Sequence, residues 1–459
     1  MNRLLVAAWI GGGAMGATLA APLPIPAQDR PDPMGPLVAE ALAKNLGLAA
    51  ERFAERRAAA EVHEARGLFL PSLGLNSRYS HFDGVPNIGD LVNPAYAALN
   101  GILGQRRFPT DIDITLPQRH DSHIELRQPL FNAGILANYA VARGRADGQH
   151  LARLTAARRL AADVQTAYLN EASARRAAEI YAASLALVQE NERVAQRLLA
   201  AGRVTPEAVF RARADRSAIE QDLAEARQRH TAAARVVNQI LQRPLDAPLD
   251  VIPDSALELP LAVDVDGAVA HALTGREELQ QVDAGMRTAQ AGVRAATAAF
   301  LPSVSVGVDY GFQSRDLAFR SSQDYWVASL VVSWNLFNGG QDAARRTAAS
   351  LDVERARTLR TDLEERIALE VRTAYDAAAV AHDAIATADA RLEAARRTFE
   401  LVRRRYEEGV ASPIELVDAR TGLTSAELNR VVTAYQYAIH YVDLERATAL
   451  RTLPEESVR

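Results

Sequence analysis

Cysteine is absent from the 459-residue chain, which excludes disulfides, thiolate metal sites and cysteine nucleophiles together. Aromatic residues make up only 6%, and Lys44 is the single lysine. The formal net charge of −5 leaves no broad basic surface for nucleic acid. What remains is rich in alanine, arginine and acidic residues, with 48% hydrophobic residues overall. This composition is typical of long, closely packed helices.

Residues suited to catalysis are also sparse. The nine histidines are scattered and form no HExxH motif. Gly339-Gly340 stands between an expected strand and an expected helix, but it lacks the further glycines and the lysine of a phosphate-binding loop. We therefore predict that the chain is not an enzyme, and that it has no catalytic residues, no metal site and no cofactor.

Residues 1–20 have the pattern of a secretory signal peptide. A basic residue, Arg3, precedes an apolar run over 4–19, and Thr18 and Ala20 are the small residues before a cleavage site. A membrane anchor is the alternative, but this run is short for a span and contains four glycines. No later stretch is long enough for a transmembrane helix, so any further part in a membrane would consist of strands.

The chain contains two copies of one pattern, because three short motifs recur in the same order in both halves. The pairs are Leu70-Pro71-Ser72 with Leu301-Pro302-Ser303, Leu130-Phe131-Asn132-Ala133-Gly134 with Leu336-Phe337-Asn338-Gly339-Gly340, and the stretch from Gly202 to Pro206 with that from Gly409 to Pro413. The offset falls from 231 to 206 after the first pair, so the first copy carries 25 extra residues there. We predict repeats over 36–243 and 267–450, a proline-containing linker over 244–266 and a tail over 451–459.

Each copy is predicted to run helix, strand, strand, helix. Proline after Leu70 and Leu301 ends the first helix, because proline disfavours the helical conformation of the preceding residue. Alternation of apolar and polar residues predicts strands, and apolar spacings of three and four predict helices. The helices are expected at 36–69, 135–200, 206–242, 267–300, 341–408 and 413–450, and the strands at about 71–80, 121–131, 302–313 and 324–335. The extra residues fall in 81–120, which we predict to be an outer loop.

The expected lengths favour a tall cylinder of antiparallel helices. A helix over 341–408 would be about 100 Å long, and the two shorter helices of its copy would together span about the same length. Two short helices in line can therefore pair with one long helix.

The predicted strands have one apolar and one polar face, and their length fits tilted transmembrane strands. A half-buried sheet in a soluble domain is the alternative. Four strands cannot close a barrel around a lumen, and open strand edges are not tolerated in lipid. We therefore expect the barrel to be shared between chains, and three chains related by cyclic symmetry would supply twelve strands.

Together, the doubled strand starts, the doubled Leu-Phe-Asn turns and the doubled Gly…Pro helix breaks resemble the TolC-like outer-membrane efflux family over about 36–450. The resemblance implies a mainly α fold with a membrane β-barrel portion. It implies a homotrimer whose twelve-stranded barrel lies in outer-membrane lipid and continues into a long periplasmic α-helical barrel. A periplasmic adaptor protein and an inner-membrane pump, proton-driven or ABC, would be the partners. The function would be a passive exit duct for drugs, metals or, in type I secretion, proteins.

The resemblance also places the functional site at the helix breaks. It implies that these breaks are periplasmic tips, formed by Gly202, Pro206, Gly409, Ser412 and Pro413. Family members carry acidic rings six and nine residues after the second glycine and a tyrosine three residues before it. The matching residues here are Glu415, Asp418 and Tyr406.

Two departures put the details of this gate in question. Ala411 replaces a basic residue of the family pattern, and Ala208 replaces the acidic residue of the first copy. Glu415 also completes a helix-capping box with Ser412, whereas Asp418 lies outside that box. Our hypothesis is that Glu415 and Asp418 from three chains form a constriction of six carboxylates that favours cations.

A periplasmic coiled-coil adaptor or scaffold is the alternative function. It would share the signal peptide and the long helices, but it would have no need for two matched pairs of lipid-type strands. A general porin is disfavoured because most of the chain is expected to be helical.

Overall fold

The computed structural model describes residues 33–81, 87–114, 119–251, 253, 259–261, 264–317, 319–451 and 453. The predicted signal peptide lies outside the described residues, as do parts of the linker and most of the tail. Helices make up most of the described chain, and one sheet of four strands accompanies them.

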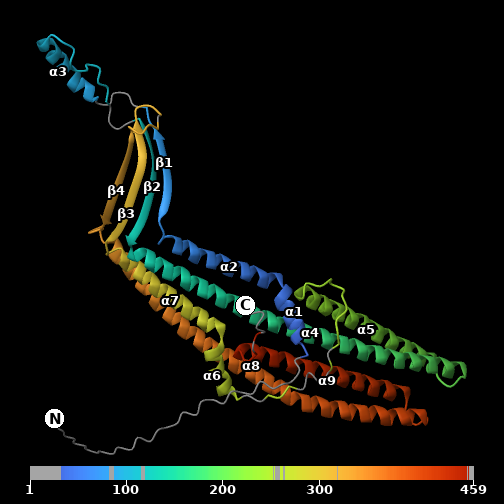
Figure 1. Cartoon of the computed structure of the whole chain (residues 1–459). Helices are drawn as coiled ribbons and strands as arrows, with labels where there is room; N and C mark the ends of the chain where they lie inside the picture. Colours follow the sequence, from blue (N-terminus) through green and yellow to red (C-terminus); the bar gives the residue numbers. More distant parts are fainter. Residues whose placement is uncertain are drawn as a thin grey trace, which may run out of the picture.

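The helices and the sheet form an elongated molecule (Figure 1). The sheet and the helix beyond it lie at one end, and the turns between the long helices lie at the other. Two very long helices, α4 (Ala133–Ala200) and α8 (Gln341–Glu407), extend from the sheet towards the far end. Their 68 and 67 residues correspond to about 100 Å each at 1.5 Å per residue.

Shorter helices pack in line along each long helix, as the expected lengths require. In the first half, α1 (Gly35–Lys44) and α2 (Leu46–Gly67) pack on the part of α4 nearer the sheet, and α5 (Pro206–Ile240) packs on the distal part. In the second half, α6 (Val265–Gly275) and α7 (Glu277–Ala298) pack against α8, and α9 (Pro413–Thr448) packs against its distal part.

The first helix of each half is broken, which differs from the continuous helices expected over 36–69 and 267–300. Asn45 and Arg276 have extended backbone angles, with ψ of 128° at both residues. The Asn45 side chain accepts a hydrogen bond from Leu48 N at 3.2 Å and donates one to the Ile240 carbonyl at 3.2 Å. It therefore caps α2 and ties the break to the end of α5, a contact that no local sequence pattern shows.

The sheet has the order β1-β2-β3-β4, and every neighbouring pair is antiparallel. Its strands are β1 (Ser72–Tyr79), β2 (His120–Phe131), β3 (Ser303–Ser314) and β4 (Asp324–Ser333). The two halves of the chain meet directly at the β2–β3 pair. A Cβ atom on Gly311 would lie 2.5 Å from the Ser122 carbonyl oxygen and from the His123 Cβ, so glycine permits this close pairing.

One face of the sheet is apolar and exposed. Leu75, Ile124, Tyr310 and Trp326 lie side by side across the four strands, and their exposed fractions run from 46% to 75%. The opposite face carries the charged and amide side chains. There, Arg127 donates to Glu125 at 2.5 Å and Tyr325 donates to Asp121 at 3.1 Å. The predicted alternation is therefore present across the whole sheet.

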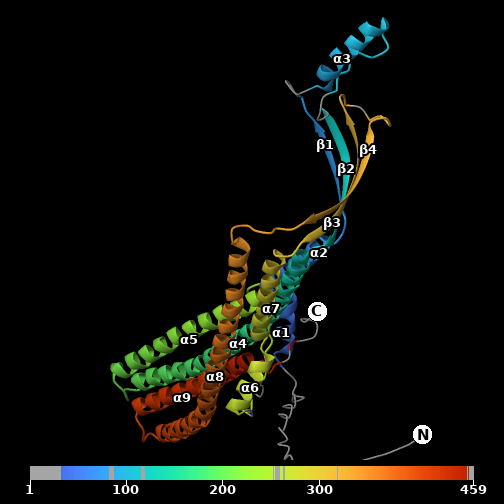
Figure 2. The same cartoon turned by 90° about the vertical axis from the view of Figure 1, so that its left-hand side faces the viewer.

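The segment predicted as an outer loop contains a helix, α3 (Ile88–Leu103), which lies beyond the end of the sheet in both views (Figures 1 and 2). Asn87 caps this helix through its bond to Gly89 N at 2.8 Å. Pro94 lies inside the helix, and prolines and glycines in this stretch favoured a loop in the sequence analysis.

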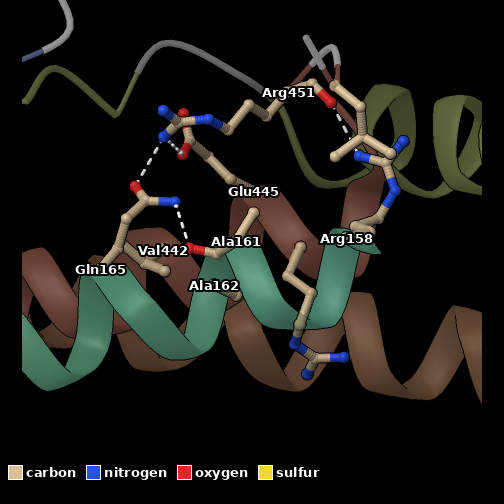
Figure 3. Close-up of a pocket in the computed structure, with 9 residues that line it drawn as sticks. Arg158, Ala161, Ala162, Gln165, Val442, Glu445 and Arg451 are labelled. Atoms are coloured by element: carbon tan, nitrogen blue, oxygen red, sulfur yellow. Dashed lines mark hydrogen bonds and ion pairs between the residues drawn. The ribbon is translucent and has the colours of Figure 1, made fainter. Parts of the chain in front are cut away.

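The two halves of the chain share a core near the middle of the molecule. Its larger cluster combines α1, α4, α5 and α9, with Val38, Val164, Leu169, Val237 and Val442 almost fully buried. Polar side chains join the same region (Figure 3). Arg158 of α4 donates to Glu277 of α7 at 2.8 and 2.6 Å and to the Arg451 carbonyl at 2.7 Å.

Candidate functional site: the helix tips

The two predicted helix breaks lie at the same end of the molecule. The α4–α5 turn and the α8–α9 turn are neighbours in Figure 1, and both stand at the end opposite the sheet in Figure 2. Contacts between α4 and α9 join the two helix pairs below the turns, including a 3.3 Å hydrogen bond between the Ser184 and Thr424 hydroxyls. The structure therefore brings together two tips that are 207 residues apart in sequence.

Both tips end their first helix in the same way. Gly202 and Gly409 have positive φ angles of 69° and 76°, a conformation that glycine adopts without strain. Gly202 N donates to the Leu199 carbonyl at 2.9 Å, and Gly409 N donates to the Tyr406 carbonyl at 3.0 Å. The backbone N–H of the residue after each glycine donates to the carbonyl of the residue just before the glycine's own acceptor. This second hydrogen bond completes a Schellman motif at each tip. The doubled glycine signal thus has a defined structural cause.

The tips differ in how the second helix begins. Pro206 and Pro413 are the first residues of α5 and α9, as predicted. Ser412 and Glu415 form the predicted capping box, in which Glu415 Oε2 accepts from Ser412 N at 2.6 Å. The Thr205 side chain makes no capping bond to any described residue. Among the described residues of the two tips, only the start of α9 therefore has a side-chain cap.

The capping bonds also set the charge of Glu415. The hydrogen bond from the Ser412 backbone N–H, followed by that from the Ser412 hydroxyl, holds the pKa of this exposed carboxyl below its ordinary value. Glu415 therefore stays ionised at neutral pH.

Asp418 lies one helical turn after Glu415, on the exposed surface of α9. Its acidic neighbour is Asp215 of α5, which no local sequence pattern marks as part of the tip. Burial and, to a lesser degree, the charge of Asp418 raise the pKa of Asp215, while Arg211 opposes the shift. Asp215 Oδ2 is buried and has no hydrogen-bond partner among the described residues. The only signal in the sequence was that Asp215 lies on a helix expected to pack against other helices.

A second feature missed in the sequence is Arg420, two residues after Asp418. Its guanidinium lies 5.5 Å from the centre of the Phe399 ring, a cation–π contact between α9 and α8. Burial lowers the pKa of Arg420, and its Nε has no hydrogen-bond partner within the described chain. Tyr406, in contrast, is half-buried near the end of α8.

The arrangement gives one chain a tip with two acidic side chains, Glu415 and Asp418, beside a protonatable carboxyl, Asp215. These three carboxyl groups can attract cations and repel anions. They include no nucleophile that is hydrogen-bonded to a general base. The described residues contain no cluster of histidine and acidic side chains that would hold a metal ion.

A comparison with family models finds that residues 268–450 match the family described as "Outer membrane efflux protein". The second half of the chain is an outer membrane efflux protein domain. This match confirms the resemblance that the doubled motifs indicated. A search of curated proteins finds no match to the chain.

Solved structures extend the likeness in fold to nearly the whole chain. The Campylobacter jejuni CmeC outer membrane channel has a TM-score of 0.75 at 17% identity, with 91% of this chain and 86% of that chain covered. A membrane protein from Pseudomonas aeruginosa has a TM-score of 0.76 at 19% identity, with 91% and 92% covered. The outer membrane protein VceC from Vibrio cholerae has a TM-score of 0.71 at 16% identity, with 90% and 95% covered. At these identities the likeness shows a shared fold.

Across the described part of the chain, none of the helices combines the length and the apolar character needed to cross a membrane.

Proposed function

We propose that the protein is a passive outer-membrane exit duct of a tripartite efflux or type I secretion system, and that it carries out no catalysis. Three copies would form a twelve-stranded β-barrel in the outer membrane and a periplasmic α-helical barrel below it, with each chain contributing two structural repeats. A periplasmic adaptor and a proton-driven or ABC pump in the inner membrane would deliver the substrates.

The four-stranded sheet carries this proposal. Its apolar face is exposed to solvent in the single chain, and β1 and β4 each pair on one side only among the described strands. A sheet with open edges is unstable in lipid, because its unpaired N–H and C=O groups have no water to bind. Pairing of β1 with β4 of the next copy satisfies these groups and closes a ring around the polar face.

Native mass spectrometry of the detergent-extracted protein, together with membrane fractionation, tests the proposal. We expect a trimer recovered from the outer membrane, and we expect it to conduct ions in a planar bilayer. A monomer found in the soluble periplasmic extract would contradict the duct and favour the coiled-coil adaptor or scaffold instead.

We further propose that Glu415 and Asp418 of three copies, with Tyr406 nearby, form the constriction at the periplasmic tips. The different capping of the two tips supports this proposal, because the α9 tip holds its carboxylate in place whereas the α5 tip carries Ala208 at the matching position. Carboxylates fixed around a narrow pore favour cations.

Single-channel recording tests the constriction. Glu415→Ala combined with Asp418→Ala should reduce the preference for cations and raise the conductance of the closed state. Glu207→Ala, which removes an exposed carboxylate from the first turn of α5, is the matched control and should leave both unchanged. Equal behaviour of the double variant and the unmodified protein would show that the gate lies elsewhere.

A further inference from the structure

Helix α3 presents an apolar surface that no other described part of the chain covers. It belongs to the unit 87–114, which stands beyond the sheet at the end opposite the helix tips (Figures 1 and 2). In both views α3 runs in roughly the same direction as the long helices and points away from the rest of the molecule. Asp90 is the one charged residue in its 16 residues.

One side of α3 is bound to the chain segment that returns towards β2. Asn93 exchanges two hydrogen bonds with the Ile112 backbone, at 2.7 and 2.9 Å. Asn100 does the same with the Phe108 backbone, at 2.7 and 2.9 Å. Tyr96 stacks against Phe108, with ring centroids 5.2 Å apart. These contacts use one face of the helix and hold the opposite face outward.

The opposite face carries a regular apolar seam. Its residues are spaced by alternating steps of three and four, and they are Ile88, Leu91, Ala95, Ala98 and Ile102. Leu91 and Ile102 are each 81% exposed. Alternation of threes and fours keeps these five residues on one side of the helix, a spacing by which parallel helices pack around one another. The exposed Leu99 and Leu103 extend the apolar surface beside them.

We propose that the α3 helices of three copies pack along this seam into a parallel three-helix bundle above the outer mouth of the channel. The proposal rests on the trimer of the proposed function, because copies of a helix that runs along a threefold channel axis lie parallel to one another. The two alanines in the middle of the seam permit a close approach of the helices. Together the three α3 units would cover the mouth.

The features of α3 fit other copies of this chain better than a lipid surface. A helix that lies in a membrane interface has a polar face rich in lysine and arginine. The polar face of α3 instead carries asparagines that bond to the protein's own backbone, and α3 contains no lysine or arginine. Its direction along the molecule also differs from that of a helix lying flat on a membrane.

Disulfide cross-linking in outer membranes tests the seam, and the absence of natural cysteine gives a clean background. Ala98→Cys lies on the seam, whereas Ala97→Cys is also at an exposed position but faces away from the seam. After oxidation with copper phenanthroline, we expect reducible dimers from Ala98→Cys to exceed those from Ala97→Cys at least about tenfold. Leu91→Cys against Asp90→Cys is a second pair if either alanine variant folds poorly.

The assembly state is measured on the same samples by native mass spectrometry. A trimer whose seam and control cysteines cross-link equally, or not at all, would overturn the bundle while leaving the duct intact. A spin label at Ala98→Cys that is reached by oxygen but not by a water-soluble nickel reagent would place the seam in lipid and would likewise overturn the bundle. Absence of the trimer would overturn the proposed function, and the bundle with it.

Discussion

At the residue scale, the tips show which side-chain roles are local and which are not. The capping role of Glu415 depends on Ser412, three positions earlier, so its box was predictable and forms as predicted. The raised pKa of Asp215 depends on burial and on Asp418, about 200 positions away on another helix. A carboxyl group such as Asp215, whose pKa depends on distant residues, can be recognised only once the packing of the helices is known.

Replacement of Asp215 by asparagine should stabilise the protein at neutral pH. The pKa of Asp215 is raised in the folded chain, so its contribution to stability is fully present below the ordinary value near 3.8 and is lost as the pH rises through the raised pKa. Asparagine cannot ionise, so Asp215→Asn removes this loss of folding stability at neutral pH. We expect the melting temperature at pH 7 to rise by up to about 2 °C, with no gain at pH 4.

Thermal unfolding of the detergent-solubilised protein at the two pH values measures the effect. Glu225→Gln, an exposed carboxyl on the same helix, is the control and should not change the melting temperature. A lower melting temperature of Asp215→Asn at pH 7 would mean that the ionised carboxylate has a stabilising partner.

At the element scale, the ends of helices decide local stability. Ser412→Ala removes the side-chain cap of α9 and should cost about 1 kcal/mol in the first turn. Thr205→Ala at the equivalent position of α5 should cost little, because the threonine side chain caps no described N–H group. Amide hydrogen exchange of the two first turns measures the difference. Equal acceleration in both variants would contradict it.

Close packing between elements gives a second prediction. A Cβ on Gly144 of α4 would lie 2.2 Å from Thr288 Oγ1 of α7, and that hydroxyl is held by its bond to the Ala284 carbonyl at 2.8 Å. Gly144→Ala should therefore destabilise the α4–α7 contact by about 1–3 kcal/mol.

Gly148, one turn further along α4, is the matched control. A Cβ there meets no described atom within 4 Å, so Gly148→Ala should stabilise the helix by up to about 1 kcal/mol. Chemical denaturation of both variants compares them. Stabilisation by both substitutions would mean that α4 and α7 are further apart than described.

At the scale of the whole molecule, the two halves depend on buried polar contacts between them. Arg158→Ala would leave the Glu277 carboxylate, which is 7% exposed, without its main partner. We expect a loss of about 3 kcal/mol in the free energy of unfolding. The adjacent Arg159, with an 81% exposed side chain, is the control, and Arg159→Ala should cost less than about 1 kcal/mol. Urea denaturation followed by circular dichroism measures both, and equal effects would contradict a role for this junction.

The order of the four strands and of the long helices followed from the sequence, because the signals for it are local. Proline after Leu70 and Leu301 precedes a strand in both halves, and Gly202 and Gly409 end the long helices as their backbone angles require. The alternation of apolar residues likewise gave the two faces of the sheet before its register was known.

The tertiary structure alone decided the features that depend on distant neighbours. The break at Asn45 is fixed by the Ile240 carbonyl, and α3 is fixed by asparagines that bond to backbone on the returning segment. Asp215 and Asp418 likewise come together only through the packing of separate helices. Local propensity cannot encode such contacts, because their free energy arises only after the chain has brought the partners together.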